Sequence, residues 1–156
     1  MITQAHYMMG RDVKYADECS ESVRANAQVV IERVNRLLDM AAYEGIRPGV
    51  VNNENSCVAS GWRPVAINDK TSNAAGHSPH IMGAAIDVRD TGTRLFARWC
   101  LRNIGRLQAL GLWMEDPRWT PSWVHLQIMP PRSGRRIFIP SSAPALCAAL
   151  PEQQEG

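Results

Sequence analysis

Three residues in the second half of this chain combine side-chain types and spacing that suit a metal site. His80 and Asp87 are close together in the sequence, and His125 follows in a later segment. Two imidazole nitrogens and one carboxylate oxygen suit Zn2+, and three protein ligands leave the fourth tetrahedral position open to water. Structural zinc sites are more often closed by four ligands, so an open set favours catalysis.

Asp87 and His125 each lie in a short segment in which apolar and polar residues alternate. Segments 84–89 and 123–128 therefore predict two half-buried strands. Side chains at alternate positions of a strand share a face, so Asp87 and His125 both point away from the core. The apolar sides are formed by Ala84, Ile86 and Val88 in the first strand and by Val124, Leu126 and Ile128 in the second.

The string from Ser78 to Asp87, SPHIMGAAID, resembles a known signature. It is similar to the S-x-H-x-x-G-x-A-x-D motif of the zinc D-alanyl-D-alanine carboxypeptidase family, which includes phage L-alanyl-D-glutamate endolysins and shares the hedgehog-like zinc fold. Ser60-Gly61-Trp62-Arg63 resembles the family's S-G-[YW]-R segment, and Trp123-Val124-His125-Leu126 resembles its late histidine strand. The resembling region, about 60–127, covers a little under half of the chain.

This resemblance implies roles for individual residues. His80, Asp87 and His125 would hold the zinc, Arg63 would stabilise charge on the attacked carbonyl oxygen, and Ser78 would line the site. His77 competes with His80 as a ligand, but the motif register selects His80 and leaves His77 at the rim, against substrate. The tryptophans around the site either belong to the core or wall a peptide cleft, and Trp62 is the candidate substrate contact among them; these are Trp62, Trp113, Trp119 and Trp123.

The general base departs from the family pattern. Many members carry an acidic residue three positions before the last histidine, where this chain has Ser122. Glu115 is the first candidate to replace it, because a strand over 112–115 beside 123–128 would bring its carboxylate to the metal. Asp116 is the second candidate, although it precedes Pro117 and would also suit a turn. The absence of any competent base is the third possibility.

Two helices complete the predicted elements. The 3.6-residue period over Ser22–Glu44, followed by Gly45, predicts a long amphipathic helix. A second helix is predicted over Thr93–Ala109, with Thr93 as its N-cap and a break or kink at Gly105. Helices with short strands predict an α+β fold, a small antiparallel sheet with flanking helices. We expect a single domain over 1–156, with a loosely attached tail over 140–156.

Composition limits the other classes of function. The chain has 156 residues, 45% of them hydrophobic, and a net charge of +2. No apolar run could span a bilayer, and residues 1–10 lack a basic segment followed by an apolar stretch, so we expect no secretory signal. The basic residues are scattered except for Arg132, Arg135 and Arg136, which argues against nucleic-acid binding. The four cysteines, Cys19, Cys57, Cys100 and Cys147, lack metal-site spacing and are expected to be reduced thiols.

The expected function is hydrolysis of stem-peptide amide bonds in bacterial peptidoglycan by a zinc peptidase of the phage or prophage endolysin type. Such a protein would be made in the cytoplasm without a signal peptide, and would act on the wall after release or from a phage particle. The alternative is a non-catalytic zinc domain that binds protein or cell wall, because Ser122 replaces the usual acid. The oligomeric state is left open.

Overall fold

The long predicted helix is the element against which the sheet packs. The computed structural model describes residues 1–50, 56–71 and 77–140, and α3 runs from Glu21 to Tyr43. It begins slightly earlier than predicted, because the Ser20 hydroxyl accepts a hydrogen bond from the Val23 N–H. Its buried stripe has the predicted helical spacing and consists of Val23, Ala27, Val30, Val34, Leu37 and Ala41.

The other elements are short. The helices before α3 are α1 (Gln4–Met8), α2 (Arg11–Lys14) and the 3-10 turn η1 (Ala16–Glu18), and those after it are α4 (Val65–Asn68), α5 (Leu95–Arg102) and α6 (Ile104–Ala109). The strands are β1 (Val58–Ser60), β2 (Ala85–Arg89), β3 (Trp113–Glu115), β4 (Trp123–Gln127) and β5 (Ile137–Phe138). Among the described residues, no helix is both long and apolar enough to cross a membrane.

The five strands form one sheet in the order β1-β2-β4-β3-β5. The pairs β1–β2, β2–β4 and β3–β4 are antiparallel, whereas β5 runs parallel to β3. The α+β class is therefore confirmed, but the prediction of an antiparallel sheet is wrong at this edge. The sheet is mixed because the chain after β4 adds β5 at the outer side of β3, in the same direction as β3.

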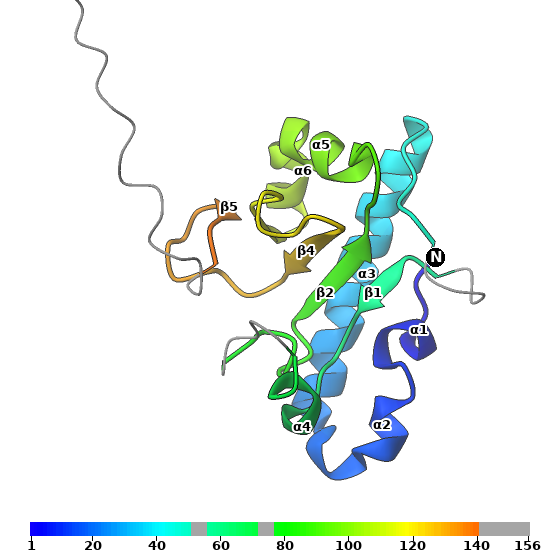
Figure 1. Cartoon of the computed structure of the whole chain (residues 1–156), viewed down its shortest axis with the longest axis vertical. Coiled ribbons are helices and arrows are strands. Elements are labelled where there is room, and N and C mark those ends of the chain that lie inside the picture. The colour runs from blue at the N-terminus through cyan, green and yellow to red at the C-terminus, as the bar shows by residue number, and fades with distance from the viewer. Residues whose placement is uncertain (51–55, 72–76, 141–156) are drawn as a thin grey trace, which may run out of the picture.

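The two faces of the sheet differ in chemistry, as the alternation predicts. One face packs against α3, which passes behind β1 and β2 in Figure 1. The buried apolar residues of that face are Ile86, Val88, Met114, Val124 and Leu126. The opposite face carries the polar side chains of the central strands, including Asp87 and His125.

The second predicted helix is two helices in the structure. The chain breaks at Asn103, whose side chain donates to the Trp99 carbonyl, so the break lies two residues before Gly105. Thr93 is not the N-cap. Instead the buried carboxylate of Asp90 accepts the N–H groups of Phe96 and Ala97 and so satisfies the first turn of α5.

The cysteine prediction holds for the described residues. Cys19, Cys57 and Cys100 are free thiols. Burial raises the pKa of each, most strongly at Cys100, so none has the lowered pKa of a reactive thiol. Cys147 and the predicted tail from residue 141 onward lie outside the described residues.

Candidate metal centre

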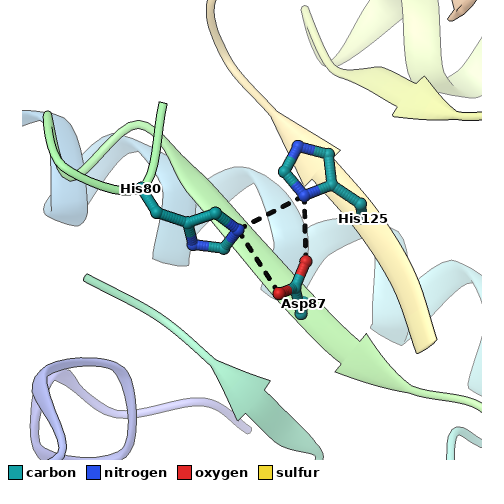
Figure 2. Close-up of side chains that lie close together, drawn as sticks. All are labelled: His80, Asp87 and His125. Carbon is teal, nitrogen blue, oxygen red and sulfur yellow. Dashed lines mark hydrogen bonds and ion pairs between the residues drawn. The ribbon is translucent and has the colours of Figure 1, made fainter. Parts of the chain in front are cut away.

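His80, Asp87 and His125 converge on one point of the polar face of the sheet (Figure 2). His125 Nδ1 lies 2.9 Å from Asp87 Oδ1, and His80 Nε2 lies 3.3 Å from Asp87 Oδ2. The two nitrogens, His80 Nε2 and His125 Nδ1, are 3.3 Å apart. All three residues are buried, with exposed fractions of 1%, 8% and 7% in chain order. This group could hold a metal ion.

Strand pairing and one tight turn place these side chains. Asp87 of β2 is directly opposite His125 of β4 in the antiparallel register. His80 lies in the turn that leads into β2, and that turn closes through hydrogen bonds from Gly83 N–H to the His80 carbonyl and from Ala84 N–H to the Pro79 carbonyl. Gly83 has φ of 69°, a left-handed conformation that favours glycine.

In each imidazole, one ring nitrogen faces away from the other two residues of the group, and we call it the outer nitrogen. Each outer nitrogen lies within hydrogen-bond distance of an oxygen atom. His80 Nδ1 lies 2.7 Å from the Gly61 carbonyl, which can only accept, so this nitrogen donates. His125 Nε2 lies 3.1 Å from Gln127 Oε1. The Gln127 amide orientation is determined in turn, because its Nε2 donates to the Met129 carbonyl at 2.6 Å. Both neutral imidazoles therefore carry their proton on the outer nitrogen.

This arrangement leaves the inner atoms without a proton to share. His80 Nε2, His125 Nδ1 and the Asp87 carboxylate are then all electron-pair donors that face one another in a buried space. Either an additional proton shared between His125 and Asp87 or a metal cation can satisfy this set, and metal-bound histidines commonly donate their outer N–H to a carbonyl or carboxylate in this way. The donor chemistry of the three residues thus fits a divalent metal.

The charges in the group are strongly coupled. Burial would raise the pKa of Asp87, but the His80 charge and hydrogen bonds from both histidines lower it well below its usual range. Burial lowers the pKa of His80. Burial would also lower the pKa of His125, but the hydrogen bond to Asp87, the Asp87 charge and the Glu115 charge raise it. The centre therefore carries a carboxylate that remains ionised at neutral pH.

Comparison with known proteins adds no assignment. No family model, curated protein or solved structure matches this chain.

Glu115 belongs to the same face as the metal group. The β3–β4 register pairs Met114 with Leu126, and continuing it by one residue brings Glu115 opposite His125. Burial raises the pKa of Glu115, the His125 charge lowers it, and the Asp87 charge raises it, with a net rise. The strand predicted at 112–115 beside 123–128 is thus confirmed, and it brings Glu115 towards the metal group.

Asp116 is engaged elsewhere. Its carboxylate makes a two-pronged ion pair with Arg118, and its Oδ1 also accepts the Arg118 backbone N–H. The hydrogen bond to the Arg118 side chain is the main cause that lowers the pKa of Asp116. A carboxylate with a lowered pKa and a bound guanidinium is a poor general base, so Asp116 has the turn role that its position before Pro117 indicated.

Arg63 and Ser78 lie beside His80. The Ser78 hydroxyl accepts the His80 N–H at 3.3 Å and lies 3.4 Å from Arg63 Nη2. The Arg63 backbone N–H donates to the His80 carbonyl. Ser78 is buried and connects the arginine to the histidine turn, whereas His77 is exposed and outside the metal group.

Trp62 belongs to the core, which is one of the two places predicted for the tryptophans around the site. Its side chain is fully buried in the core, and its indole N–H donates to the Ile81 carbonyl at 3.0 Å. The aromatic residue belongs to the core because it braces the turn that carries His80. Trp113 and Trp123, by contrast, are partly exposed. Strand alternation places Trp113 on the same sheet face as Glu115, and Trp123 on the same sheet face as His125.

Sequence reasoning missed three neighbours of the site. Gln127 follows His125 by two residues on the same strand face, so strand alternation could have identified it as a partner. The ring of Phe138 packs edge-on against the His125 ring at a centroid distance of 6.2 Å. Tyr7 is fully buried and donates its hydroxyl to the Ala85 carbonyl of β2. No sequence signal connects Tyr7 or Phe138 to the site.

Proposed function

We propose that this chain is a zinc-dependent peptidase that hydrolyses amide bonds in the stem peptides of bacterial peptidoglycan. The observation that carries the proposal is the convergence of His80, Asp87 and His125, with each imidazole donating its outer N–H to an oxygen acceptor. All three sequence segments that resemble the carboxypeptidase family contribute to this region. The hedgehog-like fold of that family, and action on the wall after release or from a phage particle, are parts of the same proposal.

Zinc is the metal we propose for this ligand set. Two nitrogens and one carboxylate oxygen suit it better than they suit Mg2+ or Ca2+, which prefer oxygen ligands. Bound at a site with three protein ligands, zinc supplies Lewis-acid activation of water and of a carbonyl group near neutral pH.

Glu115 is the residue we propose to move the proton. Its carboxylate lies on the metal face, opposite His125, and its pKa is raised by burial. A general base works best with a pKa closer to the working pH than that of an ordinary carboxylate. Glu115 would accept a proton from the attacking water and deliver it to the leaving amine.

Arg63 is the residue we propose to stabilise the developing oxyanion. Its backbone is bonded to His80, its guanidinium lies beside Ser78, and its Nε is buried with no hydrogen-bond partner. A positioned donor of this kind acts mainly in the transition state, and its removal typically lowers the rate about 100-fold or more.

A non-catalytic zinc domain is the second candidate, and Ser122 is the observation that favours it. The residue in the family's usual base position has no acidic side chain, and its carbonyl accepts the Asp90 N–H. Under this alternative the metal would stabilise the fold, and the surface would bind protein or cell wall.

Hydrolysis of purified peptidoglycan by zinc-loaded protein tests the proposal. The measurement is the release of new amino groups, with and without a chelator, by wild type and by His125→Ala and Glu115→Gln. We expect release by wild type that is lost in His125→Ala and reduced at least about 100-fold in Glu115→Gln. Glu32→Gln, an exposed change on α3, is the matched control.

The outcomes separate the candidates. Zinc-loaded wild type that binds the metal but releases no amino groups would support the non-catalytic domain. Full activity in Glu115→Gln would reject Glu115 as the base while leaving the metal centre in place.

A further inference from the structure

Two half-buried arginines, Arg11 and Arg63, meet at the backbone segment beside the His80 turn, and within the described ranges neither forms an ion pair with a carboxylate. Arg11, at the start of α2, donates from Nη1 to the Trp62 carbonyl at 2.7 Å. Trp62 directly precedes Arg63, so the two arginines are connected through one backbone segment.

The electrostatics show that the two guanidinium groups interact. Burial lowers the pKa of Arg11, and the Arg63 charge lowers it further. Burial lowers the pKa of Arg63 as well, against the attraction of the Asp87 charge. Like charges that are partly removed from water destabilise each other unless an anion lies between or beside them.

Nearby acidic groups are engaged elsewhere. Asp12, the next residue after Arg11, lies 3.9 Å from Arg24. Glu18 accepts the backbone N–H of Val65 at 2.6 Å, at the start of α4. Arg63 retains a buried Nε atom with no hydrogen-bond partner. The Asp87 charge attracts Arg63 without forming an ion pair, so among the described residues the two arginines keep donor capacity and positive charge that no paired carboxylate neutralises.

We propose that Arg11, together with Arg63, binds a carboxylate group of the peptide substrate. This inference rests on the proposed function, since the pair lies on the His80 side of the metal centre and Arg63 contacts the turn that carries His80. In this arrangement Arg63 would lie between the scissile carbonyl and Arg11. The substrate carboxylate would therefore belong to the part of the peptide that follows the scissile bond. A guanidinium suits this task because its planar fork matches a carboxylate.

The carboxylate has two possible sources in a stem peptide, and they imply different cleavage positions. A terminal carboxylate would indicate removal of the last residue of the peptide. A side-chain carboxylate of an acidic residue would indicate cleavage within the peptide. Arg11 would set specificity in either case and would take no part in the chemical step.

Calorimetric binding tests the inference without requiring hydrolysis. The zinc-loaded Glu115→Gln protein is titrated with three acetylated dipeptides: alanyl-glutamine as the free acid, alanyl-glutamine as the terminal amide, and alanyl-glutamate as the terminal amide. We expect one of the two carboxylate-bearing peptides to bind about 10- to 100-fold more tightly than the uncharged amide.

Variants identify the residue responsible. Arg11→Gln in the same background should abolish the preference, and Arg11→Lys should restore part of it. Lys14→Gln removes one exposed positive charge from the same helix and should leave the preference unchanged. Zinc affinity and the thermal unfolding midpoint should be equal in all four proteins, which excludes a general effect on the fold.

Two results would overturn the inference. One is equal affinity for the three peptides, including no measurable binding of any. The other is a carboxylate preference that survives Arg11→Gln. Peptidoglycan hydrolysis by wild type is scored separately, so an active enzyme without carboxylate preference rejects only this inference, and an inactive protein with the preference rejects only the proposed function.

Discussion

His125 lies directly opposite Asp87 where β2 pairs with β4, with its Nδ1 atom 2.9 Å from Asp87 Oδ1. The pairs on either side, Ile86 with Leu126 and Val88 with Val124, contribute to the core on the other face. A slip of one residue in one strand would turn a metal ligand or a core residue to the wrong face. The register that buries the core is therefore the register that assembles the metal centre.

We expect zinc to bind to wild type and to stabilise the folded protein. The three inner donor atoms exist as a set only in the folded chain, so saturation should raise the free energy of unfolding. At a free zinc concentration 100 times the Kd, the increase should be about 2.7 kcal/mol. Calorimetry and chemical unfolding with and without zinc measure this effect. His125→Ala should lose it and His77→Ala should retain it; equal stabilisation of both variants would reject the ligand set.

Gln127→Met should weaken zinc binding without removing a ligand. The substitution keeps most of the side-chain volume but removes the oxygen that holds the outer N–H of His125. Loss of such an outer partner typically lowers metal affinity about 10- to 100-fold. Competition with a chromogenic chelator measures the affinity. The exposed Gln108→Met change is the control, and unchanged affinity in Gln127→Met would mean that Gln127 does not orient His125.

Gly61→Ala should destabilise the protein and disturb the metal centre together. A Cβ at position 61 would collide with the Tyr7 carbonyl, and the Gly61 carbonyl holds the His80 ring. We expect a loss of about 3 kcal/mol in the free energy of unfolding, at the upper end of overpacking effects. Urea unfolding measures it. Gly105→Ala, where a Cβ meets nothing within 4 Å, should be neutral or slightly stabilising; equal effects at both positions would contradict the proposed collision.

Asp116→Asn should change stability with pH and leave zinc affinity unchanged. The folded pKa of Asp116 is lowered mainly by its hydrogen bond to Arg118, so its contribution is present above the unfolded pKa of about 3.9 and is lost as pH falls through the folded value. Wild type should therefore be more stable than the variant at pH 7, and the difference should shrink as pH falls below about 3.9 and disappear once pH is below the folded pKa. Chemical unfolding across this range measures the difference. A difference between wild type and Asp116→Asn that does not change with pH, or loss of zinc binding in the variant, would contradict the turn role.

Local patterns in the sequence were sufficient for the elements that carry the ligands. Alternation over 84–89 and 123–128 predicted that Asp87 and His125 share the face opposite the core, and the structure confirms it. The strand that we considered over 112–115, because it would bring Glu115 to the metal, is also present as β3 beside β4. These predictions succeed because the two-residue period of a strand is a local property of the backbone.

Capping and helix continuity were harder to predict. The N–H groups at the start of α5 are satisfied by Asp90, which lies upstream of the predicted N-cap Thr93. The strand β5 was not predicted for a related reason, since its parallel pairing with β3 depends on the path of the connecting loop. Both outcomes were decided by contacts between segments.

The sequence by itself determined which residues could bind a metal and on which side of their strands they lie. Only the tertiary structure decided the contacts around the candidate site: the Gly61 carbonyl on His80, the Gln127 amide on His125, and the Arg11 guanidinium on the Trp62 carbonyl. It also assigned Trp62 to the core and left Trp113 and Trp123 partly exposed. The physical reason is that residue type and periodicity act over a few residues, whereas proton positions, burial and unpaired charge depend on atoms that folding brings together from distant parts of the chain.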